Sequence, residues 1–128
     1  MIFKLSNTFI ALAAIAVASA MPQKRQDQGD LASCVFVLTP DAPVAGDLVT
    51  EFNFVIGDSL AIAAGNGVFI FGGPAVVTSV EDNNFTVQDA LSVDGKTAAE
   101  TAAILTGFTG ETKQGRQANW LFDSVNCA

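Results

Sequence analysis

From residue 30 onward, hydrophobic and polar positions mostly follow a period of two, which is typical of β-strands with one buried face. In the segment 48–56, for example, Phe52, Phe54 and Ile56 fall on one face and Glu51 falls on the other. The same criterion predicts strands at 34–39, 48–56, 68–71, 75–80, 85–93 and 119–127.

Short runs of turn-forming residues separate these strands. Glycine, proline, asparagine and aspartate gather at 65–67, 72–74, 81–84 and 94–95, where they favour tight reversals of the chain. Short strands joined by such turns predict a mainly β fold, a small antiparallel β-sandwich or barrel.

One segment departs from the period of two. Thr97 and Glu100 have the spacing of a capping box, alanine and leucine follow, and Gly107 is placed as a C-terminal stop. We therefore predict one short helix, from about Ala98 to Thr106, which Ile104 and Leu105 would pack against the sheet.

The N-terminal residues have the features of a secretory leader. Residues 1–20 combine Lys4, an apolar stretch at 8–19 and small residues before a cleavage point at Ala20. The dibasic pair Lys24-Arg25 then predicts a short pro-segment at 21–25 and a single mature domain at 26–128. We expect the protein to be secreted and extracellular.

In such a compartment the two cysteines, Cys34 and Cys127, are expected to form one disulfide. They belong to the first and the last predicted strands, which the bridge would hold side by side.

The charge of the mature segment narrows the range of partners. Three basic side chains stand against thirteen acidic ones, a net charge of −10 over residues 26–128. Such a chain is unsuited to phosphate backbones or anionic membranes, so we expect neither nucleic acid nor membrane as a partner. The same charge favours a soluble monomer.

The block Gly57-Asp58-Ser59-Leu60 resembles the nucleophile block of the GDSL esterases and lipases, and it follows a strand-like run as it does there. The resemblance implies a catalytic Ser59, with an Asp-x-x-His pair near the C-terminus to activate it. The chain contains no histidine, and neither Lys96 nor Lys113 has a local feature of a replacement base. We therefore interpret the block as a turn at the end of a strand, with a serine esterase using Ser59 as the least favoured alternative.

Other candidate chemistry is sparse. The loop 81–84 lacks the spaced ligands of a calcium motif, and no zinc motif is present, so we expect no metal and no cofactor. Asn84-Phe85-Thr86 is an N-glycosylation sequon in a predicted turn. Trp120 lies in an apolar run, which favours a core position over a sugar-stacking one.

The small size, the leader, the dibasic site and the single long-range disulfide together resemble the small secreted proteins of filamentous, mushroom-forming fungi. The resemblance implies secretion without implying a mechanism. We therefore expect no enzymatic activity but a role at the extracellular or cell-wall interface, with a cell-wall polysaccharide or a protein as the partner. A β-sandwich module that binds carbohydrate or another ligand is the alternative.

Overall fold

The computed structural model describes residues 30–65 and 68–128 of the 128-residue chain. The predicted cleavage point at Ala20 and the dibasic pair Lys24-Arg25 lie outside the described residues. The elements follow in the order β1 (Ala32–Pro40), α1 (Leu48–Ala64), β2 (Ile70–Gly72), β3 (Val76–Glu81), β4 (Asn84–Val93), α2 (Ala98–Thr106), β5 (Thr112–Gln114) and β6 (Asn119–Cys127).

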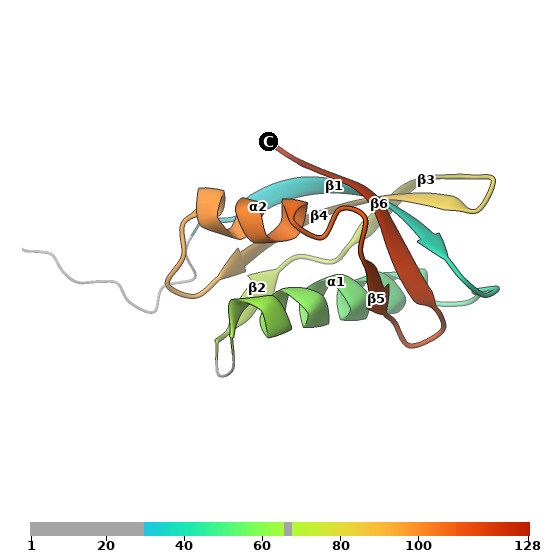
Figure 1. Ribbon diagram of the computed structural model, residues 1–128, viewed down its shortest axis with the longest axis horizontal. Helices are drawn as coiled ribbons and strands as arrows, with labels where there is room; N and C mark the ends of the chain where they lie inside the picture. The colour runs from blue at the N-terminus through green and yellow to red at the C-terminus, as the bar shows by residue number, and fades with distance from the viewer. Residues whose placement is uncertain (1–29, 66–67) are drawn as a thin grey trace, which may run out of the picture.

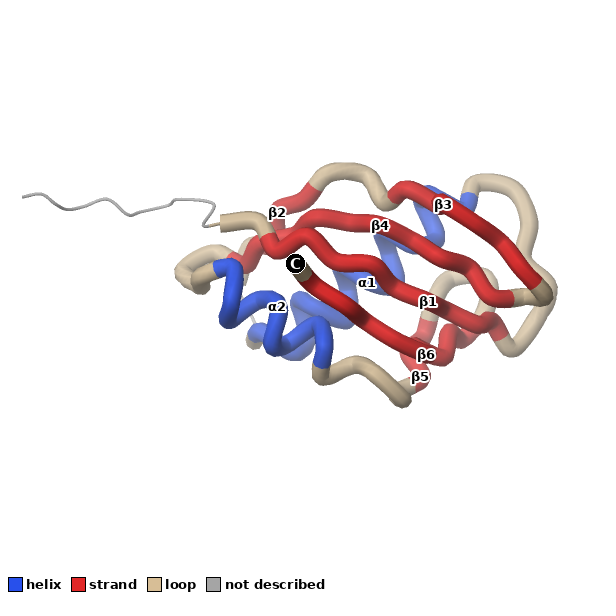
Figure 2. Tube along the Cα trace, turned by 90° about the horizontal axis from the view of Figure 1, so that it is seen from above, coloured by secondary structure: helices blue, strands red, loops and turns tan. Residues whose placement is uncertain are grey.

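All six strands belong to one antiparallel sheet that curves into a half-barrel (Figure 1). The order is β2-β4-β1-β6-β5, and β3 also pairs with β4. Helix α1 lies under the concave face, and α2 packs against β1 and β6 at one end of the sheet (Figure 2). The prediction of a mainly β antiparallel fold is confirmed.

Strands β2 and β3 share the same edge of β4. Strand β2 pairs with the residues 91–93, whereas β3 pairs with the residues 84–88. Between these pairings the loop 73–75 passes the edge of β4 at Asp89 and Ala90.

The core fills the space between the concave face and the helices. Trp120, which is fully buried, lies edge-on to Phe52 and Phe85, with ring centroids 4.7 and 5.3 Å away. The core position predicted for Trp120 is confirmed. Such edge-to-face aromatic contacts add to the free energy gained by burying the apolar surface.

The strand predicted at 48–56 is wrong, because this segment is the first half of α1. Asp47 caps the helix by accepting the N–H of Thr50 at 3.0 Å. Burial along α1 follows helical spacing, with the buried residues being Glu51, Phe52, Val55, Ile56, Ser59 and Leu60. Residues 30–65 and 68–128 therefore contain two helices where the sequence predicted one. Phe54, expected on the buried face, is exposed.

The predicted helix and disulfide are both confirmed. Helix α2 begins with the capping box of Thr97 and Glu100. Cys34 and Cys127 are cross-strand neighbours in β1 and β6 and form the bridge across a sequence separation of 93. On the chain-entropy model, a loop of this length stabilises the fold by about 4–5 kcal/mol.

A buried carboxylate joins α1 to the hairpin of β5 and β6. Glu51, only 2% exposed, accepts the backbone N–H groups of Arg116 and Gln117 at 3.1 Å and the indole N–H of Trp120 at 2.8 Å. A Cβ atom at Gly115 would overlap this carboxylate. The turn between β5 and β6 can therefore approach Glu51 this closely only with glycine at position 115. We call this set of contacts the Glu51 clamp.

Removing the clamp should destabilise the fold strongly. Glu51→Ala leaves three N–H donors without their acceptor, and we expect a loss on the order of 3 kcal/mol in the free energy of unfolding, measured by denaturant titration. The control, Asp58→Ala, removes an exposed carboxylate from the same helix. It should change the free energy of unfolding by less than about 0.5 kcal/mol. Equal stability of the two variants would contradict the structural role of Glu51.

Candidate functional site

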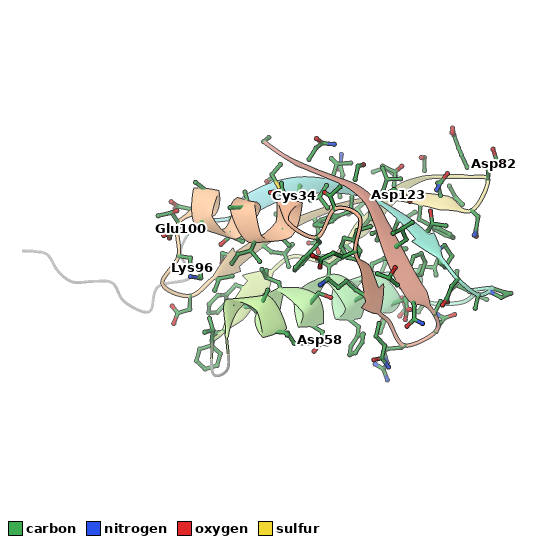
Figure 3. The ribbon with its side chains drawn as sticks, in the orientation of Figure 1. Cys34, Asp58, Asp82, Lys96, Glu100 and Asp123 are labelled. Atoms are coloured by element: carbon green, nitrogen blue, oxygen red, sulfur yellow. A yellow bond between two sulfur atoms is a disulfide. The ribbon has the colours of Figure 1, made fainter. Side chains whose placement is uncertain are left out.

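The structure places Ser59 in the interior of a helix. The block 57–60 forms part of the second half of α1, so the predicted strand-end turn is wrong. Ser59 is 8% exposed, whereas the adjacent Asp58 projects from the side of α1 turned away from the sheet (Figure 3). A hydrolase nucleophile needs an accessible hydroxyl beside a base, and the buried position of Ser59 offers poor access.

The other residues singled out in the sequence lie apart from one another. Lys113 pairs with Glu111 at 2.6 Å and lies over the ring of Phe108. The loop 81–84 is a tight hairpin turn, with Asp82 and Asn83 at positive φ. Within residues 30–65 and 68–128, no three His, Cys, Asp or Glu side chains gather as a metal site requires.

Asn84 lies on the surface that the helices leave uncovered. Its side-chain amide donates to the Thr39 hydroxyl at 2.6 Å, beside Asp123 on β6. The side chain is exposed, so a glycan attached there would extend into solvent. Glycosylation of Asn84 stays a prediction.

A pocket of about 550 Å³ lies between α1, β2 and the middle of β4, within the range of small-molecule sites. We call it the α1–β2 pocket. Its lining combines apolar and polar surface and consists of Asn53, Gly57, Ala61, Val68, Phe69, Ile70, Phe71, Gly72, Gly73, Pro74, Asp89 and Leu91. Phe69 is 69% exposed, which places an aromatic ring at the opening.

Asp89 contributes a carboxylate to this pocket. It alternates with Val87 and Leu91 on the core-facing side of β4 and is only 7% exposed. Its Oδ1 atom has no hydrogen-bond partner among the described residues. Burial raises the pKa of Asp89 from 3.8 to about 6, although a hydrogen bond from the Ala90 backbone acts in the opposite direction.

The α1 wall of the pocket is made of small and polar side chains. Asn53, Gly57 and Ala61 recur every four residues and therefore share one face of the helix. No atom lies within 4 Å of where a Gly57 Cβ would be, so this wall is open. The side-chain oxygen of Asn53 accepts the N–H of Ala75 at 2.9 Å and so holds the loop 73–75 against the helix.

A second pocket, of about 410 Å³, opens on the convex face of the sheet. It is lined by Ser33, Val35, Val76 and Gln88, among others, and shares Gly73, Pro74 and Asp89 with the α1–β2 pocket. Both pockets therefore reach the part of the β4 edge that pairs with neither β2 nor β3 and lies beside the loop 73–75.

The α1–β2 pocket was not predicted from the sequence. A strand at 48–56 would place Asn53, Gly57 and Ala61 differently from the helix, in which they share one face. One signal was present, because Asp89 stands at a core-facing position of an alternating strand, where a charge is unusual.

Comparisons of the chain with protein-family models, curated proteins and solved structures found no match. In the described part of the chain, neither helix has the length and apolar character needed to cross a bilayer.

The raised pKa of Asp89 makes stability depend on pH. The folded protein holds the Asp89 proton more tightly than the unfolded chain does. The contribution of this protonation to stability is therefore complete below about pH 4 and is lost as the pH rises through about 6. We expect Asp89→Asn to be more stable than the wild type at pH 8 by roughly 1–2 kcal/mol in the free energy of unfolding, after allowing for solvent at the pocket. It should therefore unfold at a higher temperature. The two proteins should be equally stable at pH 4.

Thermal melts at both pH values would measure this difference. Asp58→Asn, the same change at an exposed position of α1, serves as the control. A pH-independent effect of Asp89→Asn would show that its carboxyl does not titrate as described.

Ser59 should be chemically inert. Because no imidazole exists in the chain and the hydroxyl is buried, we expect no hydrolysis of short esters and no adduct with an active-site serine reagent. Mass spectrometry of the labelled protein and an ester assay would measure both. Stoichiometric labelling at Ser59 would restore the esterase alternative.

Proposed function

We propose that this protein is a secreted, non-catalytic binding module that holds a small, mainly apolar molecule in the α1–β2 pocket. Its site of action is the extracellular or cell-wall interface, as the resemblance to small secreted fungal proteins implies. The disulfide is compatible with that location.

The observation that carries this proposal is that two locally destabilising features, at Asp89 and Gly57, line one pocket. Asp89 buries a carboxylate with an unpartnered oxygen, and such a group weakens folding. Gly57 lies inside a helix, where glycine costs about 1 kcal/mol relative to alanine. Departures from locally optimal residues are expected at functional sites, and here both line the same pocket.

The pocket supports binding better than catalysis. Of the described residues that line it, Asp89 is the one that ionises, so no second group stands beside it as an acid or base. The buried position of Trp120 also weakens the carbohydrate alternative, because a sugar ring cannot stack on it.

Filling the pocket should weaken binding while the fold is kept. We expect the neutral apolar fluorophore N-phenyl-1-naphthylamine to bind the wild type, and Gly57→Leu to weaken its binding at least about tenfold. The new side chain starts where no atom lies within 4 Å, and leucine favours a helix more than glycine does. A fluorescence titration measures the affinity, and a thermal melt confirms folding.

The matched control is Ala63→Leu, which adds the same side chain at an exposed position of α1 outside the pocket lining. It should bind the fluorophore as the wild type does. Unchanged binding by a folded Gly57→Leu protein would contradict the α1–β2 pocket as the site.

A further inference from the structure

We propose that the α1–β2 pocket selects amphipathic organic amines, with the ammonium group on the Asp89 carboxylate and the apolar part against β2 and α1. This inference rests on the proposed function and names its ligand class. The observation that carries it is a carboxylate with an unpartnered oxygen beside apolar side chains in the same pocket.

The first step of the argument is the unmet hydrogen-bonding capacity of Asp89. The side chain is more than nine-tenths buried, lines the pocket, and leaves Oδ1 without a partner in the described structure. A carboxylate accepts hydrogen bonds only, and it binds a charged N–H donor most strongly. An ammonium group therefore pairs with this carboxylate better than a hydroxyl does, and a second carboxylate would be repelled.

The second step is that no cationic side chain of the described residues lines this pocket. The cations of the described segment are Lys96, Lys113 and Arg116, and none of them lines it. Lys113 is engaged by Glu111, and the Arg116 guanidinium lies over the ring of Phe54, 5.8 Å from its centroid. The acidic balance of the whole chain also attracts cationic ligands.

The third step is the shape of the remaining lining. Ile70, Phe71 and Leu91 provide apolar surface beside Asp89, and Gly57 leaves room opposite them. The exposed ring of Phe69 adds an aromatic face at the opening. A ligand with a charged end at the carboxylate and a hydrocarbon body along these residues makes use of both parts of the pocket.

Amine binding should weaken in acid. Protonation of Asp89 removes the charge that the ammonium group pairs with, while an alkylamine keeps its own charge. No other titratable side chain from α1, β2 or the loop 73–75 lines the pocket, and the neighbour of Asp89 on β1, Cys34, is in the disulfide. The nearby carboxylate of α1, Asp58, is exposed to solvent.

Calorimetric titrations of the folded protein with octylamine, octanol and octanoate test this inference. At pH 7.5 we expect octylamine to bind at least about tenfold more tightly than octanol, with octanoate weakest. Asp89→Asn should remove the preference for the amine, so that octylamine binds no more tightly than octanol. Gly57→Leu should weaken the binding of both. At pH 5, the octylamine affinity of the wild type should fall and the octanol affinity should not.

Two results would overturn the amine preference. One is equal binding of octylamine and octanol by the wild type, and the other is a preference that persists in Asp89→Asn. If N-phenyl-1-naphthylamine still binds in a manner sensitive to Gly57→Leu, the proposed function stands and the amine inference alone fails. If neither the fluorophore nor any C8 probe binds, both fail.

Discussion

The arrangement of the described fold depends on one buried carboxylate, that of Glu51. The Glu51 clamp ties the first turn of α1 to the turn between β5 and β6, at the far end of the sheet order from β2. Because side chains project from a helix at fixed angles, fixing Glu51 also fixes the rotation of α1 about its axis. That rotation turns Asn53, Gly57 and Ala61 toward β2, so the clamp on one side of the helix determines what lines the pocket on the other.

Two further connections, one covalent and one polar, hold the sheet together and attach it to that helix. The disulfide joins β1 to β6, while Asn53 holds the loop between β2 and β3 against α1. The Glu51 clamp links the β5 edge of the half-barrel to α1, and Asn53 links the opposite edge, formed by β2 and β3, to the same helix. The α1–β2 pocket lies between elements that these contacts hold together, and such preorganisation lowers the entropy lost when a ligand binds.

The sequence predicted the local features of the fold better than its long-range ones. Helix α2, the strands β1, β4 and β6 and the disulfide all have signals within a few residues or in the count of cysteines. Helix α1 was misread because Phe52, Phe54 and Ile56 fit a period of two over a short window, while its real pattern emerges over seventeen residues and begins at the Asp47 cap. The clamp and the pocket escaped prediction because Glu51, Gly115 and Asp89 meet their neighbours only through tertiary packing.

Because β2 and β3 pair with separate parts of β4, this edge of the sheet is interrupted, which affects pairing between strands of different molecules. A long, flat edge strand offers a continuous row of backbone N–H and C=O groups on which another chain can add a strand. Here one edge consists of a three-residue and a six-residue strand interrupted at Gly73-Pro74, and proline cannot donate a backbone hydrogen bond. At the other edge, β5 is three residues long and α2 packs against β6. The interruption that opens the pocket also leaves little edge on which fibrils could grow.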